Sequence, residues 1–376
     1  MTTILLLSAD TGGGHQAAAQ AIACELRGQG FLPEQIVIVD TFNRCRRWPF
    51  YRLGAVHRWA VSTRPGRLLH TLMFWWDQEP RSRGLADAFC HWGMAPLFAE
   101  LEQLYPQAVW VTLHPFITQA VGRWKLRTSP SLRMATVVTE LAFAPWACFH
   151  PAADLCCVAN QQVAQQALRV GVAPHKLRVT GLPLKPGFSQ PPPCAMACRQ
   201  KLGLARQTPT ILLISGGEGF AGSIVDLCRE LDQRLASKAQ LLVVTGYNAD
   251  LRRQLEQQTW RGSVSIRGFV ENMETCIGAA DLVLTKSGPG TLSEVLAVGR
   301  PMILFAHLPG PERRNVDYLV SQGAALFLPR QADLARGVLE LVADPPRLDA
   351  MRRCAQLLSE SGSAARVGAG IRELAT

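Results

Sequence analysis

The sequence predicts an α/β protein with two doubly wound parallel sheets, and three observations support this fold class. Short apolar runs alternate with helical patterns along the chain, as is typical of parallel sheets with helices on both faces. A proline-rich stretch divides these runs into two series. The length of 376 residues suits two domains, and 48% hydrophobic against 18% charged residues indicates well-buried cores.

Each apolar run has the length and the β-branched or leucine-rich content of a buried parallel strand. In the first series the expected strands are Ile4–Ser8, Ile36–Val39, Val109–Leu113, Met134–Val138, Leu155–Val158 and Lys176–Thr180. In the second series they are Ile211–Ile214, Leu241–Thr245, Val264–Arg267, Leu282–Thr285, Met302–Phe305 and Ala325–Phe327.

The proline-rich stretch places the domain boundary near residues 183–195. We therefore expect a first Rossmann-like domain over residues 1–185 and a second over residues 186–350. Residues 351–376 are expected to form a C-terminal helix that can cross back to the first domain.

Residues 44–95 break the alternation of strand and helix. They hold five of the nine tryptophans, together with nine arginines and only three acidic residues, so they carry more than half of the net charge of +10. Tryptophan prefers the bilayer interface, and each Arg or Lys near an anionic surface adds about 1 kcal/mol to binding. Contact with an anionic membrane surface is the expectation for this insertion; the alternative is that its tryptophans belong to the core.

Composition excludes several classes of protein. The basic balance favours anionic partners, but no nucleic-acid-binding module is recognisable, so we expect no nucleic acid partner. No run approaches the ~18–20 apolar residues of a transmembrane helix, and the N-terminus lacks the features of a signal peptide. Eleven cysteines without zinc-finger spacing suit reduced, mostly buried thiols in a cytoplasmic chain.

The first candidate site is Asp10-Thr11-Gly12-Gly13-Gly14-His15, between the first strand and a helical run. Glycines allow a sharp turn and a close approach of ligand, and the helix start presents free N–H groups. At that position the pKa of His15 is expected to be lowered, which favours a neutral imidazole that acts as a general base. The alternative is a structural turn with a surface histidine.

Two similar turns follow strands of the second series. Ser215-Gly216-Gly217-Glu218-Gly219 can receive a phosphate on its amides, or it is a plain strand-to-helix turn. Lys286-Ser287-Gly288-Pro289-Gly290-Thr291-Leu292-Ser293-Glu294 is the strongest signal, because amides beside a carboxylate fit a diphosphate and a ribose. Its alternative is a capping box with Thr291 as N-cap and Glu294 at N3.

Further polar residues end other strands. Glu312 and Asn315, in the loop after Met302–Phe305, are candidates for sugar hydroxyls, although taken alone they fit a solvated loop. In the first domain, His114, Glu140, Trp146 and His150 are candidate acceptor-site residues, and the two histidines rank below His15 because a lone loop histidine is more often structural.

Taken in order, these motifs resemble the monogalactosyldiacylglycerol synthase family, relatives of the peptidoglycan lipid-II N-acetylglucosaminyl transferase. The resemblance rests on the Asp10–His15 motif, Gly181-Leu182-Pro183, Gly216–Gly219, Arg267–Met273, Lys286–Thr291 and Glu312 to Asn315, and it spans residues 4–345.

The resemblance implies a GT-B fold, in which two Rossmann-like domains face each other across a cleft. It also implies an inverting, metal-independent hexosyltransferase that uses a UDP-sugar as co-substrate, needs no other cofactor, and glycosylates diacylglycerol while bound peripherally to a membrane. Carried over by motif, His15 is the base and Gly13 and Gly14 lie at the acceptor. The donor-binding residues are Gly216, Gly217, Glu218, Phe269, Val270, Ser287, Gly288, Gly290, Thr291, Glu294, Glu312 and Asn315. No Asp-x-Asp metal motif is present, which agrees with amides and a helix dipole at the leaving diphosphate.

Departures from the family pattern leave alternatives open. Pro311 stands where the family has Gln, which leaves the hexose undecided between galactose, glucose and N-acetylglucosamine. Glu140 replaces the Asp, and Ser287 the Ala, of the plant enzymes. Other readings are a polyprenyl-linked or other amphipathic acceptor, a UDP-sugar epimerase, and a non-catalytic nucleotide-sugar sensor.

Overall fold

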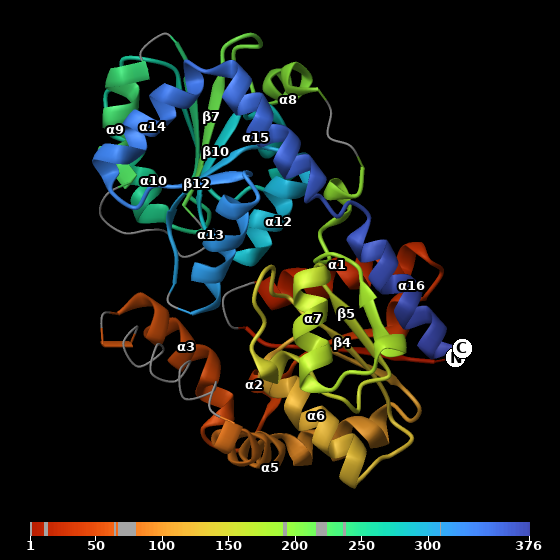
Figure 1. Ribbon diagram of the computed structural model, residues 1–376. Helices are drawn as coiled ribbons and strands as arrows, with labels where there is room; N and C mark the ends of the chain where they lie inside the picture. Colours follow the sequence, from red (N-terminus) through yellow and green to blue (C-terminus); the bar gives the residue numbers. More distant parts are fainter. Residues whose placement is uncertain are drawn as a thin grey trace. The chain divides into compact units, whose positions relative to one another are not determined.

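The computed structural model describes residues 2–10, 14–63, 65–66, 80–190, 194–215, 224–235, 238–308 and 310–376 (Figure 1). These residues form two compact units. The first comprises the chain up to Ser189 together with Gly362–Thr376, and the second comprises Gln190–Leu308 with Glu312–Ser361. Trp75 and Trp76, and the predicted site residues Gly13, Gly216, Gly217 and Glu218, lie outside the described residues.

The first unit is built on a parallel sheet with the strand order β2-β1-β3-β4-β5-β6. Ile4 and Leu6 of β1 pack against helices α1 and α16 on one face, and Leu5 and Leu7 pack against α5 and α6 on the other. Both faces are covered, which explains why the strands are continuous apolar runs. The strands are β1 (Ile4–Ser8), β2 (Ile36–Asp40), β3 (Val109–Thr112), β4 (Arg133–Val137), β5 (Leu155–Val158) and β6 (Leu177–Val179). The helices are α1 (Gly14–Gly28), α2 (Thr41–Arg44), α3 (Leu53–Ser62), α5 (Pro80–Leu104), α6 (Pro115–Arg127), α7 (Gln161–Val170) and α16 (Ser363–Ala375).

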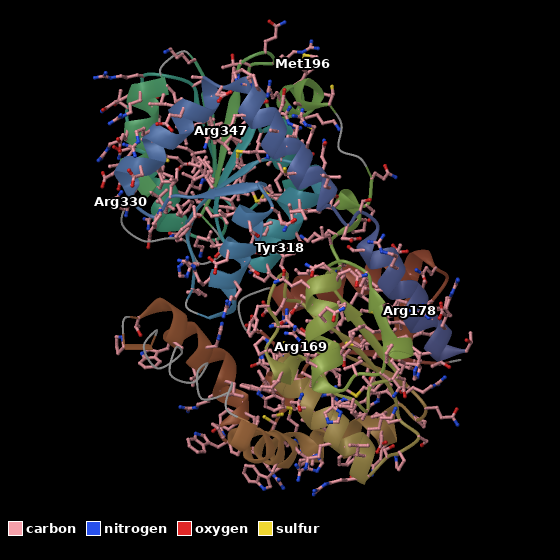
Figure 2. All side chains as sticks on the ribbon, viewed as in Figure 1. Arg169, Arg178, Met196, Tyr318, Arg330 and Arg347 are labelled. Atoms are coloured by element: carbon pink, nitrogen blue, oxygen red, sulfur yellow. The ribbon has the colours of Figure 1, made fainter. Side chains whose placement is uncertain are left out.

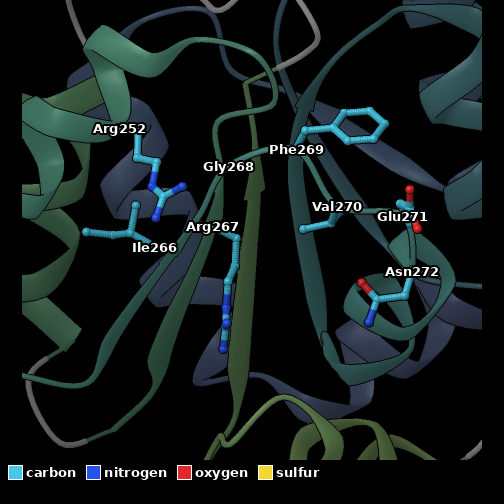
Figure 3. A pocket seen from close by; sticks show the side chains of 8 residues that line it. All are labelled: Arg252, Ile266, Arg267, Gly268, Phe269, Val270, Glu271 and Asn272. Carbon is cyan, nitrogen blue, oxygen red and sulfur yellow. The ribbon is translucent and has the colours of Figure 1, made fainter.

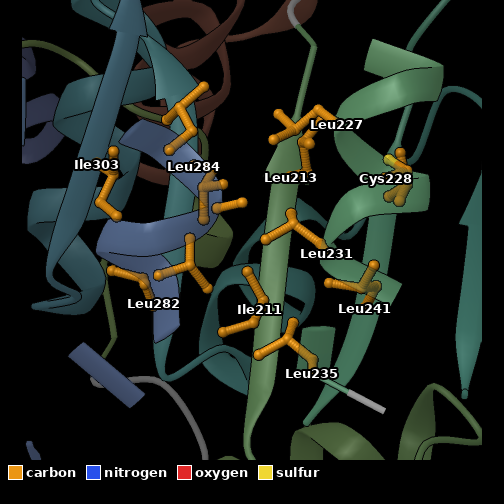
Figure 4. Packing of buried hydrophobic residues seen from close by; sticks show 14 of the residues in the cluster. Ile211, Leu213, Leu227, Cys228, Leu231, Leu235, Leu241, Leu282, Leu284 and Ile303 are labelled. Atoms are coloured by element: carbon orange, nitrogen blue, oxygen red, sulfur yellow. The ribbon is translucent and has the colours of Figure 1, made fainter. Parts of the chain in front are cut away.

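The second unit has the strand order β12-β11-β10-β7-β8-β9, also parallel throughout. Figure 4 shows Ile211 and Leu213 of β7 facing Leu227, Leu231 and Leu235 of α9 in its core. The strands are β7 (Thr210–Ile214), β8 (Gln240–Val244), β9 (Val264–Arg267), β10 (Leu282–Lys286), β11 (Met302–Ala306) and β12 (Ala325–Phe327). The helices are α8 (Ala195–Lys201), α9 (Ile224–Leu235), α10 (Ala249–Glu256), α11 (Met273–Ala279), α12 (Pro289–Val298), α13 (Pro311–Ser321), α14 (Gln331–Val342) and α15 (Pro345–Leu357).

Every strand that the sequence predicts is present, and the ends differ by at most one residue. The predicted fold class, two doubly wound parallel sheets, is therefore confirmed. The insertion differs from expectation, because α5 continues through residue 95 to Leu104. Pro96 lies inside that helix.

The C-terminal segment forms two helices where the sequence analysis expects one over residues 351–376. The helix α15 ends at Leu357, and Gly362, with φ at 71°, precedes α16. Gly362 is the N-cap of α16, and glycine adopts this left-handed backbone without strain. The α16 helix packs on α1, and the Thr2 hydroxyl donates to the Ala375 carbonyl at 2.9 Å.

Cationic side chains are spread over the surfaces of both units, as Arg169 and Arg178 in the first and Arg330 and Arg347 in the second illustrate (Figure 2). All eleven cysteines are free thiols, and most are buried. Within the described part of the chain, no helix has both the length and the apolar character that crossing a bilayer requires.

Candidate active site

Each sheet has a point where the strand order reverses, and ligands bind at such switch points in doubly wound folds. In the first unit this point lies between β1 and β3. The chain leaves β1 toward α1 on one face and leaves β3 toward α6 on the other. In the second unit the corresponding point lies between β7 and β10. The predicted sites around His15 and around Ser287 to Glu294 follow β1 and β10, so both lie at switch points.

His15 lies in the first turn of α1 and contacts two residues that follow other strands. Its ring centroid is 4.9 Å from that of His114, two residues beyond the end of β3. Its Nδ1 is 2.9 Å from the hydroxyl oxygen of Thr139, just beyond β4. The carboxyl ends of three neighbouring strands thus bring His15, His114 and Thr139 together.

Burial lowers the pKa of His15 from 6.5 to about 4. A hydrogen bond with the backbone of Leu113 raises that pKa in part, and the positive charge of a protonated His57 would lower it further. The imidazole is therefore neutral at pH 7, as the sequence analysis expects for a general base.

His114 has the structural role that the sequence left open. It is the N-cap of α6, where its Nδ1 accepts the Phe116 backbone N–H at 3.3 Å, and its ring packs edge-on against Phe42. Burial, followed by the charges of His15 and His57, lowers the pKa of His114 well below its usual value. Because Nδ1 is the acceptor, the single proton of the neutral ring is on Nε2. His114 is thus a structural cap that also offers a hydrogen-bond donor.

The other predicted acceptor-site residues of the first unit do not all lie beside His15. Glu140 is adjacent to Thr139 and partly exposed, and Trp146 begins the short 3-10 helix Trp146–Cys148. His150 packs against the middle of α6, where a Cβ at Gly122 would lie 2.2 Å from the imidazole. Its Nδ1 accepts the Ala152 backbone N–H at 3.1 Å, so the contacts described for His150 are structural.

In the second unit, α12 begins at Pro289 with Gly288 as its N-cap. Thr291 is therefore at N3 and Glu294 lies in the second turn, so the capping-box alternative is wrong. Leu292 is the first residue to donate within the helix, to Gly288 O at 3.1 Å. The preceding N–H groups of the first turn have no acceptor within the helix and are suited to bind an anion.

Neither packing nor backbone conformation requires glycine at positions 288 and 290. Both have φ outside the left-handed region. A Cβ at Gly290 would meet no protein atom within 4 Å, and one at Gly288 would meet only a Glu312 carboxylate oxygen, at 3.7 Å. Glycine is common at the N-cap position that Gly288 occupies, whereas at Gly290 the close approach of a ligand to the backbone would account for the residue.

Two residues of α13 contact the loop after β10. Glu312 Oε2 accepts the Leu308 backbone N–H at 2.6 Å and lies 3.4 Å from the Ser287 hydroxyl. Asn315 is fully buried, and its side-chain Nδ2 donates to the Ser287 carbonyl at 3.0 Å. Asn315 is thus buried within the second unit, whereas the alternative in the sequence analysis is a polar residue in a solvated loop.

A pocket of about 560 Å³ lies at the carboxyl end of β9 and is lined by Arg252 and residues 266–272 (Figure 3). Phe269, which is half exposed, and Val270, both predicted to bind the donor, line it. The Phe269 ring stacks on Tyr247, with centroids 4.4 Å apart and ring planes 15° apart. Tyr247 could not be predicted from the sequence, because it stands alone in a loop. His57 could not be predicted either, because no local pattern gives a signal for it.

Two known protein families match parts of this chain. Residues 15–184 match the family described as monogalactosyldiacylglycerol (MGDG) synthase, and residues 210–367 match the glycosyltransferase family 28 C-terminal domain. The crystal structure of MurG from Acinetobacter baumannii superimposes with a TM-score of 0.61 over 99% of this chain and all of that one, at 13% identity. That likeness supports the GT-B fold.

A probable monogalactosyldiacylglycerol synthase from Nicotiana tabacum is 31% identical over 372 residues, which is 94% of this chain. This chain spans 66% of the length of the tobacco protein. A probable monogalactosyldiacylglycerol synthase 2 from Oryza sativa subsp. japonica is 30% identical over 359 residues, covering 89% of this chain and 72% of the rice protein. The chain belongs to the monogalactosyldiacylglycerol synthase family of glycosyltransferases.

Proposed function

We propose that the protein is an inverting, metal-independent glycosyltransferase that moves a hexose from a UDP-sugar to the hydroxyl of diacylglycerol at a membrane surface. The observation that carries the proposal is the partly buried imidazole of His15 at the switch point between β1 and β3, held 2.9 Å from the Thr139 hydroxyl and next to His114. The names of the tobacco and rice relatives support the choice of reaction and acceptor.

His15 acts as the general base. When its Nδ1–H donates to the Thr139 hydroxyl, Nε2 carries the free lone pair and accepts the proton of the lipid hydroxyl. The oxygen then attacks the anomeric carbon from the face opposite the leaving UDP, and the configuration inverts. The Nε2–H of His114, next to His15, donates a hydrogen bond to the acceptor, and Gly13, Gly14, Glu140 and Trp146 line the rest of that site.

The N-terminus of α12 receives the diphosphate of the donor. Its amides around Gly288, Gly290 and Thr291 donate to phosphate oxygens, and the positive end of the helix dipole stabilises the charge that develops as UDP leaves. Glu294 binds the ribose hydroxyls, and Phe269 and Val270 face the uracil. Glu312 reaches the sugar, while Gly216, Gly217 and Glu218 complete the donor cleft.

Exposed aromatic and basic side chains of residues 44–95 mediate contact with the membrane. Trp48 is 70% exposed and Trp92 is 50% exposed, so neither belongs to the core, unlike Trp110 of β3. The Arg47 guanidinium lies 4.8 Å from the centroid of the Trp92 ring, and Phe89 stacks on the same ring. An indole at the interface beside a cation suits an anionic lipid surface.

The experiment that tests this proposal is UDP release by the purified protein with diacylglycerol vesicles, using UDP-galactose, UDP-glucose and UDP-N-acetylglucosamine in turn. Turnover that needs both the lipid and one sugar would support the proposal and identify the hexose that Pro311 leaves open. UDP binding without turnover on diacylglycerol would favour a polyprenyl-linked acceptor, to be tried next, or a nucleotide-sugar sensor.

A further inference from the structure

The helix α13 holds the loop after β10 through two side chains that are three residues apart. Residues at this spacing lie on the same face of a helix. Asn315 donates from Nδ2 to the Ser287 carbonyl at 3.0 Å, and Glu312 lies 3.4 Å from the Ser287 hydroxyl. The helix therefore contacts both the main chain and the side chain of one residue, directly before the N-cap of α12.

The hydrogen bond from Asn315 satisfies the Ser287 carbonyl at the point where the regular pairing of β10 with β11 ends. The register between β10 and β11 shifts after Thr285, and the Ser287 N–H still donates to Ala306 O at 3.0 Å. Both Ser287 and Asn315 are fully buried, so the Ser287 carbonyl would be costly to leave without a donor.

Holding this carbonyl also sets the direction of the next amide. A trans peptide is planar, and its C=O and N–H point in opposite directions. Because the Ser287 carbonyl points toward α13, the Gly288 N–H points away from α13. Gly288 is the N-cap of α12, so its N–H belongs to the group of amides that can bind an anion.

We propose that Asn315 is a positioning residue for the diphosphate loop and is not a ligand of the sugar. The inference rests on the proposed function, because it assigns a role within the same donor site. Asn315 acts through the Ser287–Gly288 peptide, which it keeps in the orientation that presents Gly288 N–H to a phosphate oxygen. Its zero exposure leaves the amide no surface for a sugar hydroxyl.

The test compares UDP, uridine and the UDP-sugar that supports turnover as ligands of the full chain. UDP and the UDP-sugar are titrated by calorimetry, and uridine, which lacks phosphate, is measured by ligand-observed NMR. The variants are Asn315→Ala, which removes the donor, and Asn315→Asp, which keeps the shape but cannot donate when ionised. Asp317→Asn is the matched control, because Asp317 is exposed on the same helix.

The affinity for UDP should fall about tenfold or more in both Asn315 variants and by the same factor for the UDP-sugar, while uridine binding changes less than twofold. The control should bind all three ligands like the wild type. If UDP binding is unchanged while the UDP-sugar alone is weakened, Asn315 is a sugar ligand and the inference is wrong. Equal losses for UDP and uridine in both variants would instead indicate general structural damage and also overturn it. A wild-type protein that binds no UDP would refute the proposed function itself.

Discussion

Substituting Gly290 by alanine separates ligand binding from folding. Gly290 lies in the first turn of α12, its φ is outside the left-handed region, and an added Cβ would meet no protein atom within 4 Å. Alanine is therefore accommodated without strain. It should raise the free energy of unfolding by about 0.5–1 kcal/mol, because the unfolded chain loses conformational freedom.

The same methyl group projects into the open space that the diphosphate is proposed to occupy. Loss of one hydrogen bond to a charged phosphate oxygen costs about 1.5–3 kcal/mol, which weakens UDP binding about tenfold to a hundredfold. The assay pairs calorimetric titration with UDP and urea unfolding of the same samples.

Gly28→Ala is the matched control. Gly28 ends α1, is exposed, and likewise has no protein atom within 4 Å of an added Cβ. This variant should show unchanged UDP affinity. A Gly290→Ala protein that is stably folded and binds UDP like the wild type would refute the argument that glycine is present for ligand approach.

Four other predictions concern the first unit. The acid limb of the kcat/KM profile should follow a group with a pKa of about 4, because burial lowers the pKa of His15. About 99% of this histidine is then neutral at pH 6. An acid limb near pH 6.5 would contradict the assignment of His15 as the base. The same shift implies that the free energy of unfolding decreases as pH falls from 6.5 toward 4, since the unfolded histidine takes up a proton first; His15→Gln should flatten this dependence in urea titrations. Thr139→Val should lower kcat about tenfold to a hundredfold while leaving UDP affinity unchanged, because Nδ1 of His15 loses its partner at 2.9 Å, and equal kcat values would count against that contact. Trp92→Ala should reduce flotation with anionic vesicles severalfold, whereas Trp260→Ala in the second unit should not; equal flotation would argue against the proposed membrane contact.

The strands and both switch points follow from local patterns, which explains why they can be predicted. A strand buried on both faces is a continuous apolar run. A glycine-rich turn directly after such a run indicates a ligand-binding loop, and this can be recognised without knowing which distant residues contact the loop. His15 and Gly290 are predicted in this way, because each follows the preceding strand after a short glycine-containing segment.

Contacts between distant segments could not be predicted in this way. The hydrogen-bonding partner of His15, Thr139, is 124 residues away in the chain. Asn315 looks like a solvated loop residue until its burial and its bond to Ser287 are seen. The capping-box alternative places the start of α12 at the wrong residue. Threonine is a common N-cap residue, but proline is equally common at the first helical position, and the helix begins at Pro289.

The role of His15 is tested most directly by a paired measurement on His15→Ala, because His15 lies at the acceptor in the proposed mechanism. UDP affinity is measured by calorimetry, and transfer is followed as UDP release with diacylglycerol vesicles. His175→Ala, at an exposed histidine, is the control. If His15 is the base, His15→Ala should bind UDP within twofold of the wild type and lose transfer about a hundredfold to ten-thousandfold. Transfer that persists near the wild-type rate, or UDP affinity that falls in parallel with transfer, would contradict the assignment of His15 as the base.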